Sequence, residues 1–308
     1  MGLKMEAILN KIKLFLLFFL LTTFNESNCQ IRIENGKYAT LNLHILQPTD
    51  LTNSQVSTGS HTLIKGTTNG VEGLWGFDTG WLNECAVKNN LVKSLGSLKI
   101  VNDMNHSYQE HSASLYSIIL DGGVTLPSNQ GTTLIWQNSF NLNGQTLDML
   151  GILAINLFKD NVLVLDYINN QLTVYDPTYF ANNFSLSDYK LISNDLDEYG
   201  VFLVPVTIKN FWGRSLFNGK LTFDTGNPNT FLSKKNVGTD YVSIYSTPSG
   251  QKFSFQQIPM SSNKVNYDGD LGYSSMNGHI FVLDYPNKNL YMYQPPWWEL
   301  FKKGKVKH

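Results

Sequence analysis

The tetrapeptide Phe-Asp-Thr-Gly occurs twice in this chain, at residues 77–80 and 223–226. Each copy follows a run of apolar and β-branched residues, so Asp78 and Asp224 are both expected at the end of a strand. Glycine allows the backbone to turn sharply after each aspartate, and threonine can hydrogen-bond locally through its hydroxyl. If the two loops face each other, two carboxyl groups meet in one site, which is an arrangement suited to acid–base chemistry.

The elements that would position these loops also occur twice. The segment Val-Leu-Asp-Tyr stands at 164–167 and again at 282–285, and each copy leads to a strand that ends in a tyrosine. Both copies predict a hairpin, over 162–175 and over 280–293, in which the aspartate has a structural role at the turn. A short helix is expected before each hairpin. Because the unit occurs twice rather than three or more times, it predicts two related lobes rather than a solenoid.

The composition favours one fold class. β-branched and aromatic residues alternate with Asn, Gly, Ser and Asp, and long stretches of helical periodicity are absent. This pattern predicts an all-β fold with a few short helices, one of them over residues 88–95.

The first 29 residues have the layout of a secretory signal peptide, with three lysines, an apolar run over 14–21 and a polar end. The apolar run is shorter than the roughly 20 residues that a membrane-spanning helix needs. We therefore predict cleavage before Gln30 and export to a periplasm or out of the cell. A lipid anchor on Cys29 is the alternative. Since Cys85 is then the only cysteine left, the mature chain must be stabilised by its core rather than by disulfides.

Charge and histidine spacing limit the kinds of partner. The formal net charge is −1 at pH 7, which argues against nucleic acid as the main partner. The six histidines show no spacing typical of metal ligands. The residues themselves therefore predict no nucleic acid, no bound metal and no stable membrane span.

Two Asp-Thr-Gly loops, each followed by an apolar-apolar-Gly segment and a short helix, resemble the pepsin-like and retropepsin-like aspartic proteases, in particular the bacterial two-lobed type. The resemblance spans nearly the whole mature chain. It implies a bilobal, pepsin-like, all-β fold of two related β-barrel-like lobes with a few short helices. The lobes would cover 30–185 and 186–296, with the signal peptide over 1–29 and a C-terminal tail over 297–308.

That resemblance also implies a role for each motif residue. Asp78 and Asp224 would be the catalytic pair, with a water between them, and the flap tyrosine would be Tyr108 or Tyr116. The residues that would support the active loops are Thr79, Gly80, Thr225, Gly226, Leu150, Gly151, Leu271 and Gly272. No cofactor or metal is implied. The expected partner is a protein or peptide substrate, and a chain that carries both halves is expected to act as a monomer rather than as a homodimer.

The implied activity is that of an aspartic endopeptidase. Two carboxyl groups about 3 Å apart cannot both ionise cheaply, so such a pair holds one shared proton. The ionised member can take a proton from the water, while the neutral member donates a hydrogen bond to the carbonyl under attack. The pattern leaves open which of the two aspartates is protonated.

Three positions depart from the family's pattern. Trp81 and Asn227 follow the two motif glycines, where Ser, Thr or Ala is usual, and Asp270 stands where an apolar residue is expected. These departures leave a second interpretation open. In it, the protein is catalytically weak or inactive and binds a peptide or glycan in the same cleft.

Overall fold

The computed structural model describes residues 31–46, 61–80, 85–103, 106–126, 130–136, 140–142, 145–147, 149–209, 215–233, 243–246, 252–255, 258–260 and 268–295. This part of the chain is mostly β-strand with few helices, so the predicted all-β class is confirmed. The helices are short, and they are η1 (Asn89–Leu91), η2 (Ile155–Phe158), α2 (Pro177–Asn183) and α3 (Tyr273–Met276). The predicted signal peptide and tail lie outside the described residues.

Among the described residues, the first half of the chain supplies fifteen strands. They are β1 (Arg32–Ile33), β2 (Tyr38–Leu46), β3 (His61–Thr68), β4 (Val71–Asp78), β5 (Cys85–Lys88), β6 (Val92–Asp103), β7 (His106–Leu115), β8 (Ile118–Leu120), β9 (Val124–Leu126), β10 (Gln130–Trp136), β11 (Phe140–Leu142), β12 (Gln145–Leu147), β13 (Met149–Ala154), β14 (Val162–Asp166) and β15 (Gln171–Tyr175).

The second half, as far as the structure describes it, supplies ten strands. They are β16 (Lys190–Ser193), β17 (Leu203–Lys209), β18 (Ser215–Phe223), β19 (Phe231–Ser233), β20 (Ser243–Ser246), β21 (Lys252–Phe255), β22 (Ile258–Met260), β23 (Gly269–Leu271), β24 (Ile280–Asp284) and β25 (Asn289–Tyr293).

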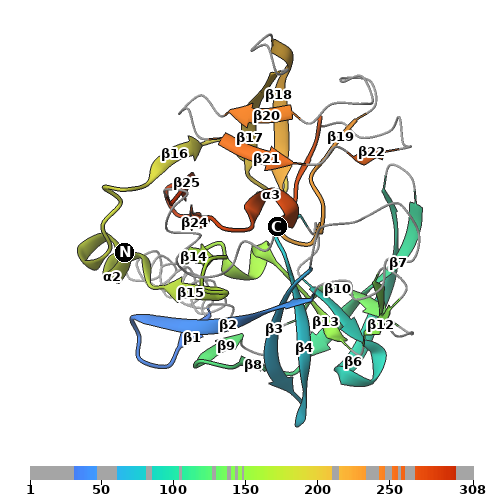
Figure 1. The fold of residues 1–308 in the computed structure, drawn as a ribbon. Coiled ribbons are helices and arrows are strands. Elements are labelled where there is room, and N and C mark those ends of the chain that lie inside the picture. Colours follow the sequence, from blue (N-terminus) through green and yellow to red (C-terminus); the bar gives the residue numbers. More distant parts are fainter. Residues whose placement is uncertain are drawn as a thin grey trace, which may run out of the picture.

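One sheet joins the two halves. Its strand order is β16-β25-β24-β14-β15-β2-β3-β4-β13-β5-β10-β7-β6, with β1, β8 and β9 attached to it. A seven-stranded sheet of order β21-β20-β17-β18-β23-β19-β22 belongs to the second half alone, and β11 pairs with β12. In Figure 1, β17, β18, β20 and β21 lie at the top and β3, β4 and β6 at the bottom, with β14, β15, β24 and β25 between them.

The region between the halves has a local two-fold arrangement. The predicted hairpins are confirmed as β14–β15 and β24–β25, and β14 pairs with β24 antiparallel about the pair Val164 and Val282. Beyond each hairpin, β2 pairs with β15 and β16 pairs with β25. The turn aspartates have the predicted structural role, because Asp166 accepts from the backbone of Asn169 at 2.8 Å and Asp284 from that of Asn287 at 3.2 Å.

One helix prediction was wrong. The segment 88–95 was expected to be helical, but only Asn89–Leu91 forms a turn of 3₁₀ helix and β6 begins at Val92. The ladder explains the difference, because Val92 lies opposite Leu115 of β7 and the pairing continues to Asp103. Tertiary strand pairing overrides a weak local helical preference.

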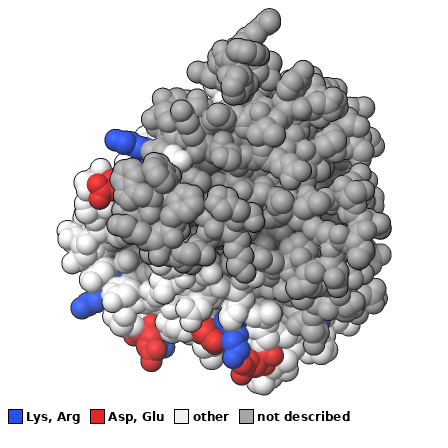
Figure 2. Space-filling model, in the orientation of Figure 1, with Lys and Arg blue, Asp and Glu red and all other residues white. Residues whose placement is uncertain are grey.

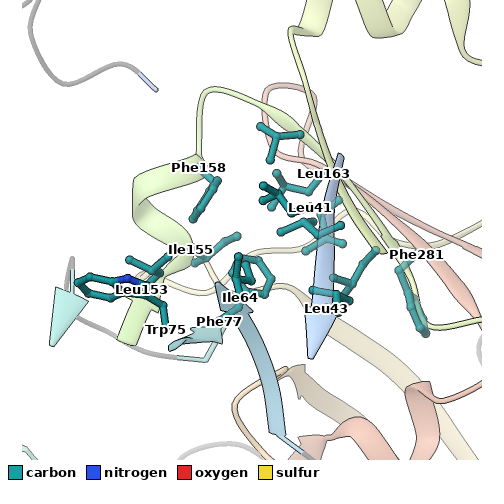
Figure 3. Close-up of a cluster of buried hydrophobic side chains, with 14 of the residues drawn as sticks. Leu41, Leu43, Ile64, Trp75, Phe77, Leu153, Ile155, Phe158, Leu163 and Phe281 are labelled. Carbon is teal, nitrogen blue, oxygen red and sulfur yellow. The ribbon is translucent and has the colours of Figure 1, made fainter. Parts of the chain in front are cut away.

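The hydrophobic core also spans the halves. Figure 3 shows Leu41, Leu43, Ile64, Trp75, Phe77, Leu153, Ile155, Phe158, Leu163 and Phe281 gathered in one buried cluster. The phenylalanine before each Asp-Thr-Gly is an anchor in this core. Phe77 meets Phe158 edge to face at 5.6 Å between ring centroids, and Phe223 meets Phe281 at 5.0 Å. Burying both rings fixes the strand ends from which the two loops leave.

Charged side chains of both signs are interspersed over the described surface on the face in Figure 2. One ion pair joins Lys65 to Glu72 and another joins Lys220 to Asp195.

No helix in the described part of the chain is both long and apolar enough to cross a membrane.

The two-fold arrangement offers a matched stability test at Tyr167 and Tyr285. The Tyr167 hydroxyl contacts the buried Thr62 hydroxyl at 2.9 Å, whereas the buried Tyr285 hydroxyl has no hydrogen-bond partner among the described residues and its ring lies beside Phe202. Tyr167→Phe should therefore lower the free energy of unfolding by about 1–2 kcal/mol, because it leaves the Thr62 hydroxyl buried and unpaired. Tyr285→Phe should be neutral or stabilising by up to about 1 kcal/mol, since it removes an unpaired group.

Urea denaturation of the two variants beside the wild type measures both effects. Each variant controls for the other, because both lose one hydroxyl from a buried ring after a corresponding strand. If Tyr285→Phe destabilises the protein as much as Tyr167→Phe, the inferred difference in hydrogen bonding is wrong.

Candidate active site

Neighbouring strands on both sides position each motif aspartate. Asp78 is the last residue of β4, which lies between β3 and β13. Asp224 directly follows β18, which lies between β17 and β23. Since the preceding phenylalanine is buried in both strands, each aspartate leaves the core at the start of a tight turn.

The threonines of the two loops bind each other. The backbone N–H of Thr79 donates to Oγ1 of Thr225 at 3.0 Å, and that of Thr225 donates to Oγ1 of Thr79 at 2.9 Å. Each hydroxyl then donates across the site, Thr79 to the Phe223 carbonyl at 2.6 Å and Thr225 to the Phe77 carbonyl at 2.8 Å. Both threonines are fully buried, so four hydrogen bonds hold the loops face to face away from solvent.

The glycines let each loop approach the other loop's carboxyl group. A Cβ atom on Gly80 would lie 2.5 Å from Cγ of Asp224, and a Cβ atom on Gly226 would overlap the carboxyl group of Asp78. Real Cβ atoms do not come this close to other heavy atoms. Only glycine therefore fits at these two positions, because each aspartate lies directly over the glycine of the opposite loop.

The two carboxyl groups share one electrostatic environment. Oδ1 of Asp78 accepts from the Gly80 N–H at 2.9 Å, and Oδ1 of Asp224 accepts from Gly226 at 2.9 Å and from Asn227 at 3.2 Å. Burial raises the pKa of Asp78, and the charge of Asp224 and the hydrogen bond between the two carboxyls raise it further. Burial also raises the pKa of Asp224, although the hydrogen bond from Asp78 and those from the backbone lower it. Both carboxyl groups are therefore harder to ionise than an exposed aspartate, and the pair can hold one shared proton.

The segments behind the loops differ in part from the expectation. In the second half, Leu271 pairs with Phe223, and Gly272 packs so tightly under the loop that a Cβ atom would overlap the Asn229 carbonyl. In the first half, Leu153 pairs with Phe77 and Ala154 with Asp78. The counterpart of Leu271–Gly272 is thus Leu153–Ala154, each followed at once by a short helix.

The expected pair Leu150 and Gly151 lies three residues earlier on β13. Gly151 lies opposite Trp75 of β4, and a Cβ atom there would overlap the Ala86 carbonyl of β5. This glycine permits close strand packing rather than support of the loop. The shared Leu-Gly dipeptide suggested the wrong counterpart of Leu271–Gly272. The number of residues between each pair and the following helix could have indicated the right one.

Beneath the second loop lies a polar cluster that the sequence did not predict. Thr230 Oγ1 accepts from the Gly272 N–H at 3.0 Å and donates to Ser275 Oγ at 2.7 Å. His61 Nδ1 lies 3.1 Å from the Gly226 carbonyl, and burial lowers the pKa of this histidine. His61 thus contacts the second active loop, although its spacing in the sequence suggested nothing of the kind.

The two tyrosines considered for the flap lie in different places. Tyr108 lies on β7 opposite Val101 of β6, in a long hairpin whose turn at 104–105 is outside the described residues. Tyr116 follows the end of β7, and the Lys93 Nζ lies 5.2 Å from its ring centroid. Trp81 is also outside the described residues. Within the described ranges, no group of His, Cys, Asp or Glu is arranged to hold a metal ion.

Comparison with known proteins shows the fold but no family. No protein-family model matches the chain, and no curated protein matches its sequence. Among solved structures it is similar to conglutin gamma, a basic 7S globulin from lupine seeds, with a TM-score of 0.54 and 11% identity over 88% of this chain and 97% of that one. It is also similar to basic 7S globulin from soybean, with a TM-score of 0.53 and 10% identity over 90% of this chain and 97% of that one.

These comparisons correct the predicted family. The assignment to the pepsin-like or retropepsin-like aspartic proteases was wrong, because the structural neighbours are seed globulins and no such family matches. The assignment depended on two short motifs and a duplication. Such motifs describe the local geometry of a loop pair, and the same fold can carry unrelated functions.

Proposed function

We propose that this protein is an aspartic-type endopeptidase that hydrolyses peptide bonds with a water activated between Asp78 and Asp224. The observation that carries the proposal is the interlocked loop pair, in which each carboxyl group lies over the glycine of the opposite loop. The four hydrogen bonds of Thr79 and Thr225 hold that geometry. The carboxyl groups are therefore fixed before a substrate arrives, as efficient acid–base catalysis requires.

A pair of carboxyl groups that holds one proton can both accept and donate a proton during hydrolysis. Asp224, as the carboxylate, takes a proton from the water while the water oxygen attacks the peptide carbonyl. Asp78 donates its hydrogen bond, and then its proton, to the carbonyl oxygen, so a tetrahedral diol forms without net charge. The proton held by Asp224 next passes to the amide nitrogen, the C–N bond breaks, and the return of the diol proton to Asp78 restores the pair.

The raised pKa values of Asp78 and Asp224 set the expected pH dependence. The reaction needs the pair with one proton. Since both pKa values lie above the ordinary value for aspartate, this state persists to higher pH than it would in an exposed pair. Activity should fall when acid protonates both groups and again when alkali removes the shared proton.

We take the substrate to be an extended segment of a protein or peptide, bound by strand-like hydrogen bonds beside the site. We take the two halves to be two lobes with the aspartate pair between them, in a monomeric chain. Export by a signal peptide over residues 1–29 belongs to the same proposal.

The alternative is a protein that binds a peptide or glycan in the same place without cutting it. The names of the two similar solved structures are those of seed globulins and mention no hydrolysis, which favours considering this alternative. A sterically correct pair of carboxyl groups next to a blocked or distorted cleft would produce such a binder.

Incubation of the purified protein with a denatured protein substrate, across acidic to mildly alkaline pH and with or without pepstatin, separates these functions. The proposed enzyme releases new peptide termini, and pepstatin suppresses the release. Binding of the substrate without any pepstatin-sensitive cleavage at any pH would establish the alternative and refute the enzyme.

A further inference from the structure

Asp270 is a buried carboxyl group next to the aspartate pair for which the proposed hydrolysis has no use. It lies in β23 with only 5% of its surface exposed, opposite Thr222 of β18 and Phe231 of β19. Within the described residues its hydrogen-bond partners are the Thr222 hydroxyl and Nδ2 of Asn227, the latter at 3.1 Å. Neither partner is a cation, so the contacts do not neutralise an ionised carboxylate.

These contacts connect Asp270 to Asp224 through one residue. The Asn227 side chain donates to Asp270, while the Asn227 backbone N–H donates to Oδ1 of Asp224 at 3.2 Å. The Asn227 carbonyl in turn accepts from the Tyr273 N–H at 2.9 Å. Asp270 therefore holds the residue whose backbone supports the Asp224 carboxylate.

The first half of the chain has no carboxyl group at the position that corresponds to Asp270. Ile152 lies opposite Gly76 in the same register in which Asp270 lies opposite Thr222, two residues before the motif aspartate in each case. An apolar residue is sufficient to fill the position, as Ile152 shows. The polar group at 270 thus adds something beyond packing on the Asp224 side.

The charge state of Asp270 follows from its surroundings. Burial raises the pKa of Asp270 to about 8, and the charge of Asp224 raises it too, against hydrogen bonds from Thr222 and Asn227. Asp78 also interacts with this group, because the charge of Asp270 raises the pKa of Asp78. The ammonium group of Lys220 on β18 is exposed and pairs with Asp195. The Asp268 side chain accepts a hydrogen bond from the backbone N–H of Lys220. The residues of β19 do not titrate.

We propose that Asp270 is a third acid of this site, a positioning residue that is protonated at neutral pH and holds Asn227 against Asp224. Its ionisation in alkaline solution places a second negative charge behind Asp224, which disfavours the Asp224 carboxylate that the proposed reaction needs and ends activity. The proposal rests on the proposed hydrolysis for its effect on rate, but the protonation of Asp270 can be tested without any substrate.

The first measurement is the urea midpoint of unfolding from pH 5 to pH 9 for the wild type, Asp270→Asn and Asp268→Asn. The folded state keeps a proton that the unfolded chain has released between about pH 4 and about pH 8, so wild-type stability falls as pH rises through this window. In Asp270→Asn the stability should fall less steeply as pH rises, by the contribution of one proton, because an amide does not titrate. Asp268→Asn, a change two residues away, is the control for removing a carboxyl group that accepts from the Lys220 backbone.

The second measurement is kcat/KM for a peptide substrate over the same pH range. Asp270→Asn keeps an amide oxygen for Asn227, so activity at pH 5 should stay within about threefold of the wild type while the alkaline limit moves up by about one pH unit or more. Asp270→Leu, which copies the apolar residue of the first half, loses the contact and should cost on the order of tenfold at every pH.

The two measurements distinguish a failure of the inference about Asp270 from a failure of the proposed hydrolysis. An unchanged stability slope in Asp270→Asn overturns the protonated Asp270, whatever the activity. An unchanged alkaline limit in an active Asp270→Asn overturns its role in the rate. If the wild type cleaves no peptide while the slope changes as expected, the proposed hydrolysis fails and the protonated Asp270 is supported.

Discussion

Asp78→Asn and Asp224→Asn should each abolish peptide cleavage, with a loss on the order of 10³-fold or more in kcat. In the proposed mechanism each aspartate has a separate task, because Asp224 receives the proton of the water and Asp78 donates to the carbonyl oxygen. An amide at either position cannot exchange a proton, so neither single variant retains half of the mechanism. The effect should fall on kcat rather than on KM, since the substrate's other contacts are unchanged.

Stability distinguishes this loss from unfolding. The raised pKa values of Asp78 and Asp224 mean that the fold opposes ionisation of the pair, so an uncharged amide should leave the unfolding midpoint at pH 7 unchanged or higher. Asp284→Asn is the matched control, because Asp284 is also buried but caps a turn outside the site. That control should cleave as the wild type does. If both site variants also cleave at the wild-type rate, the aspartate pair is not catalytic.

The second large effect is expected at the threonines. Thr79→Val keeps the shape of the side chain but removes a hydroxyl that accepts from the Thr225 N–H and donates to the Phe223 carbonyl. Both groups are left buried without those partners, at a cost of about 3 kcal/mol in the free energy of unfolding. Thr225→Val removes the two symmetric bonds and should cost a similar amount.

Serine provides the control for both positions. Thr79→Ser loses the methyl group and keeps the hydroxyl, so it should lose no more than about 1 kcal/mol. Chemical denaturation of the two valine and two serine variants measures the difference. Valine variants as stable as the serine variants would show that the four cross-loop hydrogen bonds do not hold the site together.

Much of this site could be predicted from the sequence because its parts are local and repeated. The motif copies predicted the strand ends, and the repeated Val-Leu-Asp-Tyr segments predicted the hairpins over 162–175 and 280–293. These features depend on a few neighbouring residues, so the pattern carries them even where the family assignment does not.

What could not be predicted depends on contacts between distant segments. The Leu150–Gly151 pair has the right residue types but the wrong register, and only the parallel pairing of β13 with β4 shows that Leu153 takes its place. Asp270 looked like a defect because its partner Asn227 is 43 residues away in the chain. The departures at 227 and 270 looked unrelated in the sequence, whereas the two side chains form one hydrogen-bonded pair.

The antiparallel pairing of β14 with β24 has a consequence for how the molecule is made. The ladder from Val162 opposite Asp284 to Asp166 opposite Ile280 joins segments separated by most of the second half. A ribosome must therefore release nearly the whole polypeptide before that ladder can close. Until then β14 presents an unpaired edge that invites association with other chains, and the acids of the two loops have not yet met. Partly synthesised protein should therefore be inert towards peptides and in need of protection from aggregation.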